Sequence, residues 1–489
     1  MGAAKTSTHR CALSLSMAIA LMAALSDGLS TPIVAQVSPS SHSFTQRLRG
    51  DGQADDGAVL QAAIDAGVSP LVLPPGRYRL TRPLVIDLDS AGYFALDGQG
   101  VAVLVMDGPG PAIRLRGTHF RSADPKQFDE RVWQRQRMPL IDRLAIEGTH
   151  PQAIGIQASG TMQLTISRVH LRNLLHGIHL VENNRNLTIS DCHIYDNRGV
   201  GIFYDAVNLH QSNLVGCHIS YNAQGGIVSR GGNVRNIHIN GCDLESNMSP
   251  DSPPTANILI DCRNSRYGTA EVAITGCTIQ HNNPSPDSAN IRIVGRSLDS
   301  TAGRTVREGN ITITGNVLSD VQVNLHLQQC RGVAITGNTF WQGYRHNLLV
   351  EGCHSVVMAA NNMDRNPRYD YGNTQEANNS VVFRNCEDCN ISGLHLTHAW
   401  RDQAAVTIED CHRMLVAQAT ILDCDNIGLL LRNVTDSMVC NCLIRHDHPE
   451  TTFTPILLDA CENVVLSGNM WRDSPSPDTP NLSTGATAR

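Results

Sequence analysis

Four residues in this sequence carry groups that acid–base chemistry needs. Asp261, Arg292, His326 and Glu351 each stand in a short apolar segment, and these segments read NILID, NIRIV, NLHLQ and NLLVE. A guanidinium binds carboxylates, and an imidazole accepts a proton near neutral pH. If the four segments lie side by side, we expect these residues to form a catalytic cluster.

The same segments and the stretches beside them offer groups that hold a ligand. Amides hydrogen-bond hydroxyls, arginine forks bind carboxylates and tyrosine rings stack on flat faces. The insertions 248–256, 282–289 and 364–377 precede the segments, and loops beside one face often form the walls of a site. The predicted binding residues are Asn257, Asn290, Asn324, Asn347, Gln328, Arg263, Tyr267, Arg365, Arg368 and Tyr369. For the four asparagines, an outward ladder that fixes the turns is an equal alternative.

A repeat explains how such segments come together. LTISDCHI ends at Ile194, NLVGCHI at Ile219, IHINGCDL at Leu244 and VAITGCTI at Ile279, and further copies run to Trp471. The usual period of 22–25 residues is typical of a solenoid. Because the segments are short and rich in β-branched residues, each repeat reads as three strands, one coil of a parallel β-helix of about fifteen rungs.

The cysteines fit the same repeat. Cys192, Cys217, Cys242 and Cys277 hold the position that Asn316 holds in a later copy. A small side chain recurring once per coil indicates a buried stack, so we expect the thiols to be free rather than paired. No paired CxxC motif of a zinc site is present. No cofactor is required by the sequence, and Asp261 is a candidate ligand for calcium.

Composition and the N-terminus narrow the class of protein. The 489 residues are only 4% aromatic and 17% charged, with a net charge of −7, which argues against nucleic acid as a partner. Lys5 and Arg10 precede an apolar stretch at 11–25, so residues 1–35 read as an export signal and place the chain outside the cytoplasm, with no membrane span after signal removal. We expect a cap and first strands at 36–93, the β-helix at 94–473 and a tail at 474–489.

The N-terminal cap carries a family resemblance. GDGQADDGAVLQAAIDAG (50–67) followed by LPPGRYRL resembles the N-terminal signature of the pectate-lyase-like superfamily. The resemblance implies a right-handed parallel β-helix, with a capping helix at Asp51–Ala66 and carbohydrate chemistry. The NTDGID, DD and GHG set of polygalacturonases and the DPHE motif of alginate epimerases are absent, so no catalytic residue is carried over from a family motif.

Alignment of the coils gives an alternative interpretation of the four residues. One outer row contains Glu351, Arg384, Glu409, Arg432 and Asp459, whose alternating charges predict a cross-strand ion-pair ladder. The alternation stops at Val294 and Gln328, beside Arg292 and His326, and this break favours a binding site there. Asp205 with His210 is the second choice.

The reaction follows from the residue types. β-Elimination from a uronate needs a base and a neutralised carboxylate, and Arg292 with His326 supplies both. Hydrolysis needs two carboxyls at defined separations, and Asp261 lies about 14 Å from Glu351, which is too far. We therefore expect an exported enzyme that cleaves a uronate-containing polysaccharide. The alternatives are a glycoside hydrolase and a non-catalytic glycan-binding or surface-structural β-helix.

Overall fold

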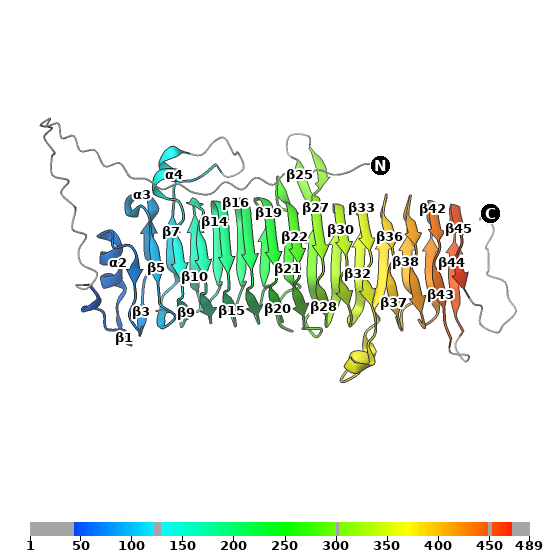
Figure 1. Cartoon of the computed structure of the whole chain (residues 1–489), viewed down its shortest axis with the longest axis horizontal. Coiled ribbons are helices and arrows are strands. Elements are labelled where there is room, and N and C mark those ends of the chain that lie inside the picture. Colours follow the sequence, from blue (N-terminus) through cyan, green and yellow to red (C-terminus); the bar gives the residue numbers. More distant parts are fainter. Residues whose placement is uncertain (1–43, 122–128, 300–302, 448–451, 472–489) are drawn as a thin grey trace, which may run out of the picture. The chain divides into compact units, whose positions relative to one another are not determined.

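The computed structural model describes residues 44–121, 129–299, 303–447 and 452–471. Their strands form a parallel β-helix, in which each coil pairs with the coil before it and the coil after it (Figure 1). The predicted export signal and C-terminal tail lie outside these residues. Within the described residues, no helix combines the length and the apolar character that a membrane span requires.

One strand of each coil belongs to a sheet of 16 strands. In order, these strands are β1 (Asp51–Asp55), β3 (Gly76–Leu80), β6 (Ala102–Met106), β9 (Ala145–Gly148), β13 (His170–Arg172), β15 (His193–Tyr195), β17 (His218–Ser220), β20 (Asp243–Glu245), β23 (Thr278–Gln280), β28 (Val317–Ser319), β31 (Thr339–Phe340), β34 (Asn362–Met363), β37 (His395–Thr397), β40 (Thr420–Leu422), β43 (Leu443–Arg445) and β46 (Met470–Trp471). Sixteen strands agree with the predicted number of rungs.

The other strands of the coils share a 28-stranded sheet that bends around a corner. Before the corner lie β4 (Leu84–Asp87), β7 (Gly110–Arg116), β10 (Ala153–Ser159), β18 (Ile227–Arg230), β21 (Ala256–Asp261), β24 (Ala289–Val294), β29 (Val321–Gln328), β32 (Gly343–Glu351), β35 (Ser380–Arg384), β38 (Ala404–Glu409), β41 (Ile427–Arg432) and β44 (Thr454–Asp459). The long strands β14 (Ile178–Ser190) and β16 (Ile202–Val215) run through it.

After the corner lie β2 (Leu71–Val72), β5 (Ala95–Asp97), β8 (Leu140–Asp142), β11 (Thr161–Met162), β12 (Thr165–Ser167), β19 (Asn233–Asn240), β22 (Gly268–Thr275), β27 (Gly309–Thr314), β30 (Arg331–Thr336), β33 (His354–Ala359), β36 (Asn390–Ser392), β39 (Leu415–Ala417), β42 (Thr435–Cys440) and β45 (Glu462–Ser467). A hairpin of β25 (Arg296–Asp299) and β26 (Arg304–Arg307) extends from one coil. Short helices α3 (Leu88–Ala91) and α4 (Glu130–Arg135) lie in loops.

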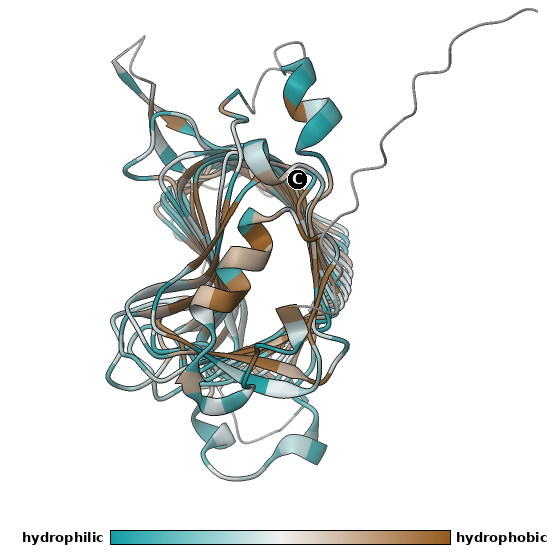
Figure 2. Cartoon of the chain, turned by 90° about the vertical axis from the view of Figure 1, so that its left-hand side faces the viewer, coloured by the Kyte–Doolittle hydropathy of each residue, from teal (hydrophilic) through white to brown (hydrophobic). Residues whose placement is uncertain are grey.

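Helix α2 (Gly57–Asp65) covers the N-terminal end of the coil (Figure 2). Leu60, Ala63 and Ile64 are buried. The Gln61 side chain hydrogen-bonds both the N–H and the C=O of Val85, which satisfies an edge strand that no earlier coil pairs. The predicted cap is therefore confirmed, although Asp51–Asp55 forms strand β1 rather than the start of the helix.

Ladders of identical side chains fill the interior. The Asn316 amide donates to Asn338 Oδ1 and that of Asn338 to Asn361 Oδ1, both at 3.0 Å. Cys192, which holds the equivalent position, is buried and donates to the carbonyl of Ser190. The fourteen cysteines of the described residues are free, and twelve are buried, which confirms the predicted stack.

Candidate functional site

The structure brings Arg292, His326 and Glu351 together on adjacent coils. Arg292 Nε donates to His326 Nδ1 at 3.2 Å, and His326 Nε2 lies 2.9 Å from Glu351 Oε2. The first contact makes Nδ1 an acceptor, so Nε2 carries the proton and donates it to Glu351. Arg292 and His326 are each only 6% exposed. Both histidine nitrogens are therefore engaged, and neither side chain faces a ligand.

The three residues continue the ion-pair ladder instead of interrupting it. Glu351 Oε1 accepts from Arg384 at 3.4 Å, and Glu409 accepts from both Arg384 at 2.9 Å and Arg432 at 3.2 Å. Arg432 then reaches Asp459 at 3.0 Å. The alternative interpretation of the row is confirmed from Glu351 to Asp459. At its other end the ladder steps sideways through His326 to Arg292, because these long side chains reach across to the next strand.

The far end of the ladder ties down two loops. Arg292 donates to the carbonyl oxygens of Thr255 at 3.3 Å and Asp287 at 2.7 Å, and its guanidinium pairs with the Asp287 carboxylate at 3.0 Å. Thr255 and Asp287 belong to the two insertions that we expected to wall a site. The loops lie against the sheet, where Ala256 and Ala289 pack with Val228 and Leu259. Arg292 therefore holds these two loops against the sheet.

Asp261 stands apart from the other three predicted catalytic residues. Its carboxylate accepts two hydrogen bonds from the guanidinium of Arg263, at 2.9 and 2.6 Å. These hydrogen bonds and the positive charge of Arg263 lower the pKa of Asp261 against the opposing effect of burial. Tyr267 is exposed and lies beside Arg266, whose guanidinium carbon is 5.2 Å from the ring centroid. Gln328 donates to Glu351 at 3.1 Å.

The prediction that four asparagines offer amides outward was wrong. Asn257, Asn290, Asn324 and Asn347 have no exposed surface. The amides form a ladder: Asn257 donates to Asn290 at 2.8 Å, Asn290 to Asn324 at 2.7 Å and Asn324 to Asn347 at 2.8 Å, and Asn347 donates to the carbonyl oxygen of Asn379. Three further asparagines extend this ladder toward the N-terminus. They are Asn197, Asn222 and Asn247, and Asn247 donates to Asn257. An extended segment that turns a corner points its first side chain inward, and strand alternation alone does not reveal this.

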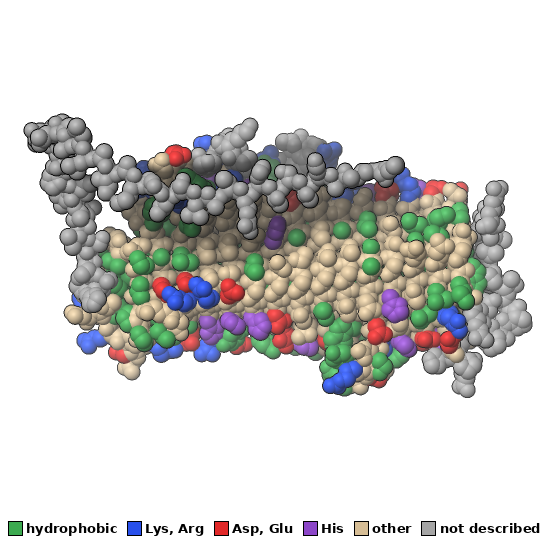
Figure 3. Space-filling model, viewed as in Figure 1, with side chains coloured by type: hydrophobic (Ala, Val, Ile, Leu, Met, Phe, Trp, Pro, Cys, Tyr) green, Lys and Arg blue, Asp and Glu red, His purple; other side chains and the backbone are tan. Residues whose placement is uncertain are grey.

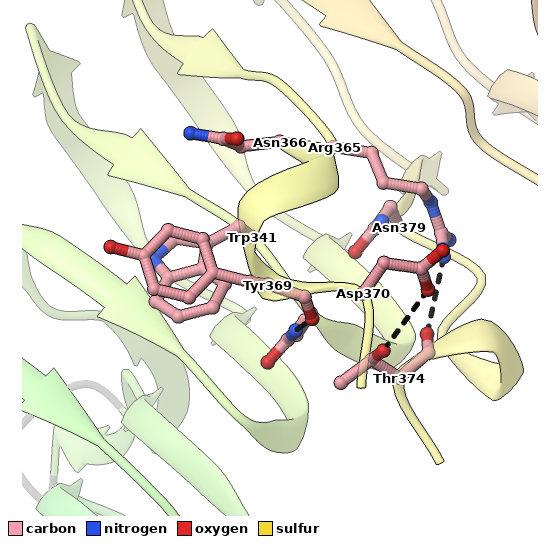
Figure 4. A pocket seen from close by; sticks show the side chains of 8 residues that line it. Trp341, Arg365, Asn366, Tyr369, Asp370, Thr374 and Asn379 are labelled. Atoms are coloured by element: carbon pink, nitrogen blue, oxygen red, sulfur yellow. Dashed lines mark hydrogen bonds between the residues drawn. The ribbon is translucent and has the colours of Figure 1, made fainter. Parts of the chain in front are cut away.

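The loop at 364–377 holds the remaining predicted binding residues (Figure 4). It contains the short helices η1 (Pro367–Tyr369) and η2 (Thr374–Glu376). The Tyr369 ring lies on Trp341, with centroids 4.3 Å apart. Arg365 lies 3.9 Å from the centroid of Trp400 and donates to three carbonyl oxygens, and burial lowers its pKa to about 10. Arg368 is exposed.

The pocket between these side chains is small. Its volume of about 20 Å³ is room for water rather than for a sugar ring. Trp341, Tyr369 and Arg365 therefore hold the loop together, and their contacts are satisfied within the chain.

The second-choice pair is also rearranged. Asp205 Oδ2 lies 2.9 Å from His179 Nε2, on the preceding coil. His210 lies beyond the corner, where its Nε2 is 2.8 Å from the amide nitrogen of Asn236. Gln157 links His179 to Arg114, through contacts of 3.4 and 3.0 Å. The Asp205 side chain is 44% exposed, so this pair is more open than His326 with Glu351.

An open groove lies beyond the corner, on the outer side of strands β12, β14, β16 and β19. We call it the polar groove. Its volume is about 450 Å³, and its lining residues are Met138, Gln163, Thr165, Asn186, Thr188, Gln211, Asn213, Asn236 and His238. Sequence reasoning missed it because uncharged side chains do not stand out in a row. The available signal was the column Gln163, Asn186, Gln211, Asn236 at one position of the repeat.

Comparisons with known proteins fit this fold. A family model described as a right handed beta helix region matches residues 133–268. The described coils therefore have the fold of a right-handed parallel β-helix. A second family model, described as periplasmic copper-binding protein (NosD), matches residues 262–473. The search of curated proteins found no match to this chain.

Several solved structures are similar to this chain at low sequence identity. The Azotobacter vinelandii mannuronan C-5 epimerase AlgE4 A-module is 14% identical, with 90% of this chain and 97% of that chain covered and a TM-score of 0.34. The Streptococcus pneumoniae surface adhesin PfbA is 13% identical, at 89% and 93% coverage and 0.38. A mannuronic acid specific polysaccharide family 6 lyase from human gut microbiota is 10% identical, at 86% and 90% coverage and 0.44. At these identities the likeness is one of fold alone.

The residues that the structure describes do not fit a copper site. The described residues contain no group of three or more His, Cys, Asp and Glu side chains placed to hold a metal. Copper binds thiolates, but burial raises the pKa of Cys262 and of Cys424 to about 12, which keeps both protonated. The calcium expected at Asp261 is not supported either, because Arg263 occupies that carboxylate.

Proposed function

We propose that this β-helix protein is exported and binds a polysaccharide along the polar groove. The observation that carries the proposal is the lining: amide, hydroxyl and imidazole side chains from four adjacent coils face one open volume of about 450 Å³. Binding sites for small ligands in proteins have volumes of about 300 to 1,000 Å³. Side chains repeated at each strand suit a ligand that is itself a chain.

Export is supported by two features. The N-terminal segment has the basic start and apolar stretch of an export signal. The family model that matches residues 262–473 is described as a periplasmic protein. We therefore place this protein in the periplasm, at the cell surface or outside the cell.

Cleavage by Arg292 and His326 has less support than binding. A base must reach the proton it removes, whereas His326 uses Nε2 on Glu351 and Nδ1 on Arg292, and both side chains are 6% exposed. Hydrolysis by Asp261 and Glu351 has the wrong spacing, since strands β24 and β29 separate them and hydrolytic carboxyls lie at most about 9.5 Å apart.

A second candidate function is β-elimination from a uronate at His179. Asp205 fixes the His179 ring through Nε2, and Nδ1 meets only a 3.4 Å contact from Gln157. Nδ1 of His179 is therefore more available as a base than Nε2 of the same ring. Arg114, which donates to Gln157, would neutralise the carboxylate of the sugar. His179 as the base and Arg114 as the neutralising cation would take the roles that the sequence predicted for His326 and Arg292.

The test is a panel of neutral and uronate polysaccharides, followed by affinity electrophoresis and by assays of the products. We expect retarded migration with at least one polymer, without new reducing ends. New reducing ends with an ultraviolet-absorbing product, lost in His179→Ala, would replace binding by elimination. New reducing ends without that chromophore would indicate a hydrolase, and no retardation by any polymer would refute the proposal.

A further inference from the structure

We propose that the polar groove selects a neutral, hydroxyl-rich glycan and that its amide row contacts the chain along the coil axis. The inference rests on the proposed polysaccharide binding and adds the class of glycan. It differs from the sequence-based expectation of a uronate polymer, because the groove lies beyond the corner from the charged ladder.

Two rows of side chains line the groove in register. Thr165, Thr188, Asn213 and His238 are direct partners on neighbouring strands. Gln163, Asn186, Gln211 and Asn236 form the second row, and each has a positive φ, of 56°, 54°, 68° and 59°. This conformation is uncommon outside glycine and turns the strand at the corner. Because it recurs at the same point of each coil, the amides follow one another at the strand spacing.

The amide row has unused hydrogen-bonding capacity. Gln163 Oε1 and Asn186 Oδ1 accept no hydrogen bond from the described residues. Both oxygens are buried, and because terminal amide torsions are broad, rotation of the amide would turn them toward the groove. Partners are expected for such atoms, and sugar hydroxyls donate and accept in the same way as these side chains. Met138, 67% exposed at one end of the groove, adds an apolar surface for the C–H face of a ring.

The lining carries no fixed charge. Of the nine lining residues, only His238 has an ionisable side chain. Arg235, the nearest cation on β19, donates to the carbonyl oxygens of Val234, Tyr267 and Gly268, and Arg185 is only 9% exposed. His210, beside Arg185, has a pKa lowered by burial and by that charge. A uronate carboxylate would lose its water here without gaining a cation.

Figure 3 shows one face of the molecule, on which uncharged side chains and backbone dominate the middle and charged side chains gather toward the lower and upper edges. Four adjacent strands span roughly 14 Å at the strand spacing of about 4.8 Å, which is room for a few sugar rings in a row. The groove is therefore suited to an internal stretch of a long glycan.

The test compares polymers by charge. The probes are a neutral β-glucan and a neutral galactomannan, against alginate and polygalacturonate, with dissociation constants measured by calorimetry at about 50 and about 500 mM NaCl. We expect a neutral polymer to bind with less than a twofold change between the two salts. Asn186→Ala should weaken that binding about tenfold, since hydrogen bonds to the groove are lost.

Asn310→Ala is the matched control. Asn310 occupies the same column with a φ of 56°, on β27 outside the groove lining, so the backbone cost of both changes is equal. Its affinity should stay within twofold of the wild type. Thr188→Val, which removes a hydroxyl without changing size, supplies the same readout if Asn186→Ala does not fold.

The outcomes separate the two proposals. If only the acidic polymers bind, and Asn186→Ala or Thr188→Val weakens that binding, polysaccharide binding in the groove stands and the neutral-glycan inference fails. If a neutral polymer binds but the groove variants behave like Asn310→Ala, the groove is not its site and the inference also fails. If no polymer binds, both proposals fail together.

Discussion

The carboxylate of Glu351 offers the sharpest test of the ion-pair ladder. The hydrogen bond from His326 is the main cause that lowers its pKa from 4.5 to about 2, with Gln328 and Arg384 adding to it against the effect of burial. A depressed carboxyl pKa stabilises the folded state above the unfolded pKa, and this stability is lost as pH falls through the folded pKa. The loss therefore falls between about pH 5 and about pH 2.

The size follows from the shift. Lowering the pKa of Glu351 from 4.5 to about 2 corresponds to about 3 kcal/mol of folding stability. This value is an upper bound, because the side chain is 30% exposed and solvent screens its interactions. Glu351→Gln removes the titrating group, so the difference in unfolding free energy between wild type and variant should shrink from near this value at pH 7 toward zero at about pH 2. Denaturant unfolding measured across that range gives the difference at each pH.

Glu462→Gln is the control, because it removes an exposed carboxylate on the last coil. Its difference from the wild type should stay near zero at every pH. If the Glu351→Gln difference is instead the same at pH 7 and at pH 3, Glu351 is not held ionised by His326 and the ladder reasoning is wrong.

Three further outcomes are expected. Arg384→Ala should lower stability by less than about 1 kcal/mol, because its side chain is 42% exposed, and a larger loss in denaturant unfolding would contradict that. Asn290→Ala should cost about 2 to 4 kcal/mol in the same assay, since it leaves buried partners on Asn257 and Asn324 unsatisfied; an unchanged midpoint would refute the ladder's role. Native protein should leave most thiols unreactive toward Ellman's reagent until it unfolds, and full reactivity before unfolding would mean that the cysteine stack is open.

The repeat period was enough to predict the fold. Because each coil places Cys or Asn at one position before a short strand, alignment of the copies fixed the register. Ile258 pairs with Ile291, and Ile291 pairs with Leu325, as that register requires. The helix at Gly57–Asp65 was predicted from its apolar spacing and from the open end that a β-helix must cover.

The site was harder to predict for physical reasons. Arg292 and His326 were found as a break in a charged row, but a row describes only Cα positions. Their side chains are long enough to bond across strands, so the ladder runs diagonally from Arg292 through His326 to Glu351. The polar groove depends on where a concave surface forms, which sequence periodicity does not contain.

The buried asparagine ladder passes from one turn position to another at Asn247 and Asn257. Asn247 donates to Asn257 at 2.8 Å, although nine residues of loop separate them. Earlier coils supply the amide before a short turn, and later coils supply it after an insertion, while the amide stack continues unbroken. The length of the corner loops is thereby uncoupled from the stability of the coil. At this turn, between β20 and β21 and at the equivalent turns of later coils, loops can be lengthened, exchanged or grafted while the amide stack is kept. New recognition surfaces can therefore be added to the scaffold there.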